Sequence, residues 1–125
     1  MENRIMVIDD DPAVLEAIEL SLTYCGFQVR SLLSAENFFP MLADFDPHLV
    51  IVDYQLRGYN GGEICMKLKS DPQTCTIPVI LLSAHSEAGL MTDKYHFDEF
   101  LSKPFDLSVL LNKIHGFINQ NPVID

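Results

Sequence analysis

Short apolar runs alternate along this chain with segments whose apolar residues recur at helical spacing. A short continuous apolar run predicts a strand that is buried on both faces. The run at 27–31 alternates only weakly between apolar and polar side chains, which predicts an edge strand. Strands are therefore expected at 5–8, 27–31, 49–52, 79–82 and 97–101.

Helices are expected between these strands. In the first helix, Leu15, Ile18 and Leu22 keep helical spacing. Asp11 is a candidate N-cap, and Pro12 follows it at the first helical position, where proline is tolerated. The remaining helices are expected at 35–44, 61–70, 86–95 and 107–118.

Two of these helices carry conflicting signals. Ser34 is a candidate cap for the second helix, but Pro40 lies inside its span and predicts a kink or a later start. In the fourth helix the apolar positions are sparse and comprise Leu90, Met91 and Tyr95. We therefore expect a short helix at 86–95.

Five strands that alternate with five helices predict an α/β fold, a three-layer α/β/α sandwich around a five-stranded parallel sheet. The most apolar runs, at 5–8 and 49–52, belong in the centre of the sheet, and the run at 27–31 belongs at an edge. With right-handed crossovers, the strand order 2-1-3-4-5 satisfies both conditions. The length of 125 residues, without a linker or repeat, predicts a single domain over 1–125.

Composition excludes several classes of protein. The net charge of −10 argues against direct binding of nucleic acid, whose phosphates require Lys and Arg, and favours a basic partner or a bound cation. No apolar run is long enough to span a membrane and no signal-peptide pattern is present, which predicts a cytoplasmic protein. The three cysteines lack zinc-site spacing and are expected to be free thiols.

Acidic residues follow the two strands expected at the centre of the sheet. Ligands of such sheets bind beyond the carboxyl ends of the strands, where the strand order reverses. Asp9, Asp10 and Asp11 follow the first strand, and Asp53 follows the third. Carboxylates that converge repel one another, and Mg²⁺ or Mn²⁺ removes this conflict. Alternatively, 9–11 form only a solvated turn and a helix cap.

A hydroxyl and an ammonium group follow the last two strands. Ser83 and Lys103 are expected on the same rim as the carboxylates. A hydroxyl donor, a cation and a metal ion match the three oxygens of a phosphoryl group, and a carboxylate can act as the nucleophile that accepts it. Taken singly, Ser83 is more simply interpreted as a turn residue, and Lys103 as a surface lysine. His85 could approach the site or lie in a solvated loop.

With these residues in place, the chain resembles the receiver domain of two-component response regulators over essentially its whole length, which implies a flavodoxin-like fold of the receiver type. The resemblance also implies a phosphoacceptor signalling domain, not an enzyme, with at most self-phosphorylation and self-dephosphorylation. The donor would be a histidine kinase or a histidine phosphotransfer protein, whereas the output partner stays open. The matching residues are Asp9-Asp10, Asp53, Gly61, Ser83-Ala84 and Lys103-Pro104-Phe105.

The resemblance also implies roles for individual residues. Asp53 would accept the phosphoryl group and bind Mg²⁺. Asp10 would bind the ion directly, Asp9 through water, and Gln55 through its backbone carbonyl. Lys103 would pair with the Asp53 carboxylate or its phosphoryl group, and a cis bond between Lys103 and Pro104 would aim it into the site. Two residues would form the switch that follows phosphorylation, namely Ser83 and the aromatic Phe100. Alternatively, Phe100 is an ordinary half-buried aromatic residue of its strand.

The sequence departs from the family pattern beside this site. Arg57 stands where receivers commonly have proline, and 58–60 follow it in a loop next to the site. The stretch from Ser83 to Phe100 is shorter than usual, which predicts an atypical output face.

Three other functions compete with a phosphorylated receiver. One is a pseudo-receiver that binds its partner without phosphorylation, although Asp53, Asp10 and Lys103 speak against an idle site. Another is a Mg²⁺-dependent phosphohydrolase, which requires a second carboxylate where Gln55 stands. A flavin carrier would need a phosphate-binding loop in place of the aspartates at 9–11. A stand-alone receiver and a piece of a larger regulator or hybrid kinase both fit the sequence.

Overall fold

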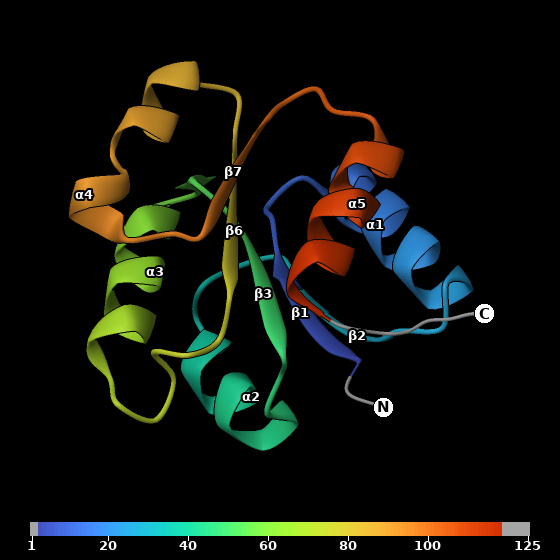
Figure 1. The fold of residues 1–125 in the computed structure, drawn as a ribbon, viewed down its shortest axis with the longest axis horizontal. Helices are drawn as coiled ribbons and strands as arrows, with labels where there is room; N and C mark the ends of the chain where they lie inside the picture. Colours follow the sequence, from blue (N-terminus) through green and yellow to red (C-terminus); the bar gives the residue numbers. More distant parts are fainter. Residues whose placement is uncertain (1–2, 119–125) are drawn as a thin grey trace.

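The computed structural model describes residues 3–118 as a three-layer α/β/α sandwich (Figure 1). Five parallel strands form the central sheet in the order β2-β1-β3-β6-β7, which confirms the predicted topology. Among the described residues, no helix has the length and apolar character needed to cross a membrane. The strands are β1 (Arg4–Ile8), β2 (Gln28–Leu32), β3 (Leu49–Asp53), β6 (Val79–Ser83) and β7 (Glu99–Ser102).

The central strands lie where continuous apolar runs predict them. Every residue of β3 and β6 is buried, because helices cover both faces of the sheet. The two edge strands begin later than expected. Phe27 and Phe97 are buried, but they lie before the first residues of β2 and β7. Apolar runs thus mark burial more closely than they mark strand ends.

Helix α1 (Pro12–Tyr24) begins as predicted. The Asp11 carboxylate accepts hydrogen bonds from the backbone N–H groups of Ala13, at 3.0 Å, and Val14, at 3.5 Å, and thereby caps the helix. Gly26, which has a φ of +96°, reverses the chain after it. The buried face of α1 consists of Leu15, Ile18 and Leu22.

Helix α2 (Phe38–Phe45) begins later than expected and Ser34 does not cap it. Pro40 is the third residue of this helix. Backbone N–H groups in the first turn have no partner within the helix, so proline costs no hydrogen bond there. The later start therefore accommodates the proline. Helix α3 (Gly61–Ser70) and helix α5 (Leu107–Phe117) lie close to their predicted spans.

The segment predicted as a single short helix at 86–95 is divided in two. A 3₁₀ helix, η1, spans Ser86–Leu90, and a single α-helical turn, α4, spans Thr92–Tyr95. The Tyr95 side chain is buried beside α3, where a Cβ atom on Gly62 would lie 2.8 Å from its ring. Among the described side chains of 86–95 only Ala88 and Tyr95 are buried, which explains why no longer helix forms.

Two apolar clusters hold the layers together. Helices α1 and α5 pack on one face of the sheet, where Ile18 and Ile114 join Val7. Helices α2, α3 and α4 pack on the other face, where Phe38 and Ile64 join Val50. Because the strands run parallel, the carboxyl ends of β1, β3, β6 and β7 all lie at one edge of the sheet (Figure 1).

Candidate functional site

Three carboxylates meet at the carboxyl edge of the sheet. Asp9 follows β1 and Asp53 ends β3, and these strands pair in parallel with Ile8 opposite Val52. One carboxylate oxygen from each of Asp9, Asp10 and Asp53 lies within 4.8 Å of the others. Asp9 is fully buried and Asp53 is 4 % exposed, so their charges are poorly hydrated.

Lys103 supplies the opposing charge. Its ammonium group lies 2.8 Å from Oδ2 of Asp9 and 3.2 Å from Oδ1 of Asp53. The Lys103 backbone N–H donates to the Ser83 carbonyl at 2.8 Å, which fixes the chain beyond β7 to the end of β6. The bond between Lys103 and Pro104 is cis. Residues from opposite ends of the chain thus form one charge cluster.

The protonation of Asp53 reflects this environment. Burial is the largest cause that raises its pKa, the negative charge of Asp9 adds to it, and Lys103 only partly opposes both, which leaves the pKa at about 6. Burial alone would lower the pKa of Lys103, but its hydrogen bond to Asp9 and the charge of Asp53 outweigh burial and raise it. Lys103 therefore stays charged, whereas Asp53 is held in a costly ionised state at neutral pH.

The geometry of the carboxylates fits a small hard cation. Oxygen ligands at about 2.1 Å from one Mg²⁺ lie roughly 3 to 4 Å apart, and the 4.8 Å limit on the three carboxylate oxygens is close to this. A cavity of about 500 Å³ opens beside Asp10, Asp53 and Gln55 and leaves room for the ion and its waters. A doubly charged cation would also remove the repulsion that raises the pKa of Asp53.

Asp9 is less free than the other two carboxylates. Its Oδ2 accepts from the Lys103 ammonium at 2.8 Å, and its Oδ1 accepts from the backbone N–H of Asp11 at 2.9 Å. Both oxygens are therefore already engaged, which favours a contact to the ion through water. Asp10 is half-buried and lines the cavity directly.

Gly61 sets the position of Asp53. The Gly61 N–H donates to the Tyr54 carbonyl at 2.7 Å, and a Cβ atom on Gly61 would overlap the backbone carbonyl of Asp53. Only glycine allows the first turn of α3 to approach the end of β3 so closely. Asn60 caps α3 by accepting from the Gly62 N–H at 2.7 Å, which fixes the helix in this place.

The residues expected to form the switch lie outside the acidic cavity. Ser83 is fully buried, and its hydroxyl oxygen accepts from the backbone N–H of His85 at 2.9 Å. Ala84, not Ser83, lines the cavity. Phe100 is half-buried, with its ring packed against Gly89 and 6.2 Å from the ring of Phe97.

His85 lies in the exposed loop. Its imidazole Nδ1 is 3.5 Å from a carboxylate oxygen of Glu87 in η1, and it does not line the acidic cavity. The solvated-loop interpretation of this residue therefore agrees with its surroundings.

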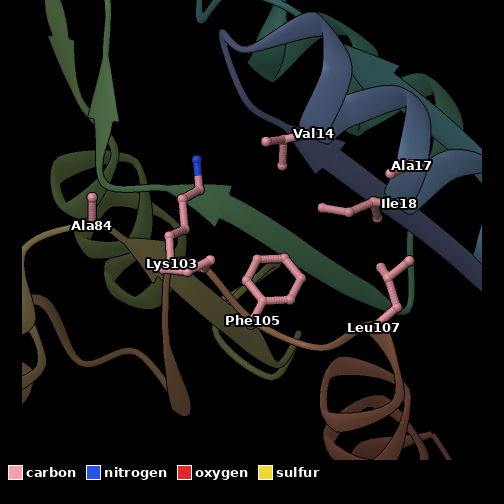
Figure 2. Close-up of a pocket in the computed structure, with 8 residues that line it drawn as sticks. Val14, Ala17, Ile18, Ala84, Lys103, Phe105 and Leu107 are labelled. Carbon is pink, nitrogen blue, oxygen red and sulfur yellow. The ribbon is translucent and has the colours of Figure 1, made fainter.

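A second, apolar cavity of about 390 Å³ lies next to the charge cluster (Figure 2). Val14 and Ile18 of α1 face Phe105 and Leu107 across it. The aliphatic part of Lys103 lines this cavity, and its ammonium group points away toward the carboxylates. Burial of this stem along an apolar wall restricts the orientation of the charged end.

Sequence reasoning did not predict one element at the site. The residues after Asp53 form a hairpin, with β4 (Gln55–Leu56) antiparallel to β5 (Tyr59–Asn60). Arg57 and Gly58 form its two-residue turn, and Gly58 supplies a φ of +72°. Arg57 lines the acidic cavity together with Asp53. Arg57 departs from the family pattern, which commonly has proline here, but no role was predicted for it.

A family model described as the response regulator receiver domain matches residues 5–115. Among curated proteins, the chain is 31 % identical over its full length to the response regulator PleD of Caulobacter vibrioides, of which it covers 28 %. It is 29 % identical over 94 % of its length to the DNA-binding dual master transcriptional regulator RpaA of Synechocystis sp., of which it covers 49 %. The chain thus spans half or less of these relatives.

Solved structures share the fold. The beryllofluoride-activated receiver domain of DrrB superposes with a TM-score of 0.82 at 30 % identity. This match covers 94 % of the present chain and 97 % of that domain. A putative response regulator from Chloroflexus aurantiacus superposes with a TM-score of 0.86 at 26 % identity, over 94 % of this chain and 98 % of the other.

Proposed function

The chain belongs to the response regulator receiver domain family, and from this premise we propose that Asp53 is the residue on which it accepts a phosphoryl group. Receiver domains of two-component systems are phosphoacceptor signalling domains and are not enzymes in general. One observation carries the assignment to Asp53. Among residues 3–118, its buried carboxylate is the one that lies both beside the Lys103 ammonium, at 3.2 Å, and on the wall of the acidic cavity.

The transfer is a displacement at phosphorus. A carboxylate oxygen of Asp53 forms the new P–O bond while the P–N bond of a phosphohistidine donor breaks, and the electron pair returns to the imidazole nitrogen. Lys103 holds a phosphoryl oxygen and offsets its charge. Water that attacks the same phosphorus afterwards releases inorganic phosphate and restores Asp53. Self-phosphorylation from a small donor would follow the same course.

Magnesium is the expected cation, and Mn²⁺ is a second candidate of the same ligand preference. Asp10 and Asp53 would hold it through carboxylate oxygens, Gln55 through its backbone carbonyl and Asp9 through water. When bound, the ion supplies positive charge that offsets the charge of the transferring group. The engaged oxygens of Asp9 and the cavity beside Asp10 support this division of roles.

Switching and output are also part of the proposal. Ser83 would break its contact with the His85 N–H, rotate its hydroxyl toward a phosphoryl oxygen and move the following loop, which packs against Phe100 through Gly89.

The donor is a histidine kinase or a histidine phosphotransfer protein, the partners of receiver domains in general. Residues 1–125 as one domain, and a cytoplasmic location, stay predictions of the sequence.

Phosphorylation in vitro tests the assignment of Asp53. The chain is incubated with acetyl phosphate and Mg²⁺ and examined by intact-mass spectrometry. The parent should gain the mass of one phosphoryl group, and the Asp53→Asn protein should gain none. Asp44→Asn, which alters an exposed carboxylate in α2, is the matched control and should behave like the parent. Chelation of Mg²⁺ should abolish the gain.

Two results would overturn the assignment. A phosphorylated Asp53→Asn protein would move the acceptor to another residue. A parent that neither gains a phosphoryl group nor binds beryllofluoride would favour a pseudo-receiver that works through its surface alone.

A further inference from the structure

Arg57 borders three hollows at the carboxyl edge of the sheet. It lines the acidic cavity with Asp10 and Asp53, and it also lines a neighbouring hollow of about 400 Å³ with Asp10. A third hollow of about 380 Å³ is lined by both Arg57 and Glu36. A long side chain at this junction can turn toward the acidic cavity or away from it.

The hairpin holds the backbone of Arg57 and leaves its side chain free to move. Leu56 pairs with Tyr59, so the turn begins and ends at fixed positions, and Gly58 takes the left-handed conformation that it requires. The Arg57 side chain is exposed, and no ion pair holds it among residues 3–118. Its guanidinium group is therefore available to a ligand in the cavity.

Phosphorylation adds negative charge to the site, which favours a second cation there. When all three carboxylates are ionised, they and the Lys103 ammonium leave an excess of two negative charges, which one Mg²⁺ offsets. A phosphoryl group on Asp53 then adds about one further negative charge. In the unphosphorylated chain the Lys103 ammonium already bonds Asp9, so part of its donor capacity is in use before a phosphoryl group arrives.

We propose that Arg57 is a second phosphoryl-binding cation, which contacts the group carried by Asp53 and retains it in the site. Guanidinium donors form paired hydrogen bonds to phosphoryl oxygens, which suits a group at the mouth of a cavity. This inference rests on the proposed function of Asp53 and names a positioning and retention role at that same site.

The proposal predicts opposite effects on two ligands. Without Arg57, binding of beryllofluoride in saturating Mg²⁺ should weaken about fivefold, because one charged hydrogen-bonding contact is lost. Binding of Mg²⁺ alone should tighten by about twofold, because a positive charge near the site is removed. Loss of a merely structural residue would weaken both.

Arg57→Gln is the variant for this test, and Arg30→Gln is its matched control. Arg30 is an exposed arginine of β2 whose guanidinium lies 4.9 Å from the ring centre of Phe45, and its replacement changes the net charge of the protein by the same amount. Mg²⁺ affinity is measured by calorimetry and beryllofluoride affinity by fluorine NMR. The Arg57→Gln protein should also lose its phosphoryl group faster than the parent, whereas Arg30→Gln should match the parent in all three measurements.

The outcomes separate this proposal from the function on which it rests. If the parent binds beryllofluoride and Arg57→Gln binds it equally well, the role of Arg57 is refuted and that of Asp53 stands. If Arg57→Gln weakens Mg²⁺ as much as beryllofluoride, the residue is structural and the proposal also fails. If the parent does not bind beryllofluoride in Mg²⁺, both proposals fall together.

Discussion

Replacement of Asp53 by asparagine should stabilise the metal-free protein at neutral pH. The Asp53 carboxylate is almost fully buried, and it ends β3 beside the buried carboxylate of Asp9. Asparagine has nearly the same shape and carries no charge. The substitution therefore removes the repulsion and the cost of burying an ion, while the neutral form of the site is retained.

The magnitude follows from the pKa of Asp53, which is about 6 in the folded protein against an ordinary value of 3.8. Below the lower value both the folded and the unfolded chain hold the proton, and the two proteins should differ little. Between the two pKa values only the unfolded chain loses the Asp53 proton. The free energy of unfolding of the parent therefore falls by about 1.36 kcal/mol for each pH unit of increase. Above about pH 6 the accumulated loss levels off at about 3 kcal/mol, and the asparagine variant does not suffer it.

Urea unfolding of both proteins in the presence of EDTA measures this difference. At about pH 7.5 the Asp53→Asn protein should be more stable by about 3 kcal/mol, and at about pH 5 by roughly half as much. Saturating Mg²⁺ should reduce or reverse the difference, because the ion stabilises only a site with its carboxylate. Comparison of the two proteins at each pH cancels the titration of other carboxylates.

A stability difference that does not change between these pH values would show that Asp53 does not titrate in this range. A destabilised Asp53→Asn protein at neutral pH, without metal, would mean that the pair with Lys103 outweighs burial and repulsion. Either result would refute the electrostatic description of the site.

Three further outcomes follow from the same geometry. Gly61→Ala should lose about 2 kcal/mol in urea unfolding because its Cβ meets the Asp53 backbone, whereas Gly116→Ala, with open space around it, should not destabilise. Lys103→Ala should lose about 3 kcal/mol because it leaves a buried carboxylate unpaired, and Lys113→Ala, whose partner Glu99 is only half-buried, less than about 1 kcal/mol. Mg²⁺ at about 100 times its dissociation constant should add about 2.7 kcal/mol to the parent in thermal unfolding, and no gain would contradict the metal site.

The sheet was predictable because a strand that is buried on both faces has apolar residues at consecutive positions. Runs such as 49–52 and 79–82 have no polar positions, as expected of the central strands of a parallel sheet. The ends of elements were less predictable. The start of α2 depends on how Pro40 fits its first turn, and β4 and β5 are too short to show any period.

The convergence of Asp9, Asp53 and Lys103 was predictable for a different reason. Each lies at the carboxyl end of a parallel strand, so the topology alone brings them to one edge. The direction of the Ser83 hydroxyl is not encoded in this way, because it depends on a rotamer and on the His85 N–H. The place of Arg57 on the cavity wall follows from a two-residue turn that sequence periodicity does not reveal.

The division of 86–95 into η1 and α4 has a consequence for how the molecule moves. Elements of one turn gain little from cooperative hydrogen bonding, so this stretch can rearrange by opening a few local bonds. Leu90, which is 85 % exposed, adds no packing, whereas Ala88 and Tyr95 are buried and hold the two short elements in place. Amide hydrogens of this stretch should exchange with solvent long before those of α3, because only a few local hydrogen bonds must open.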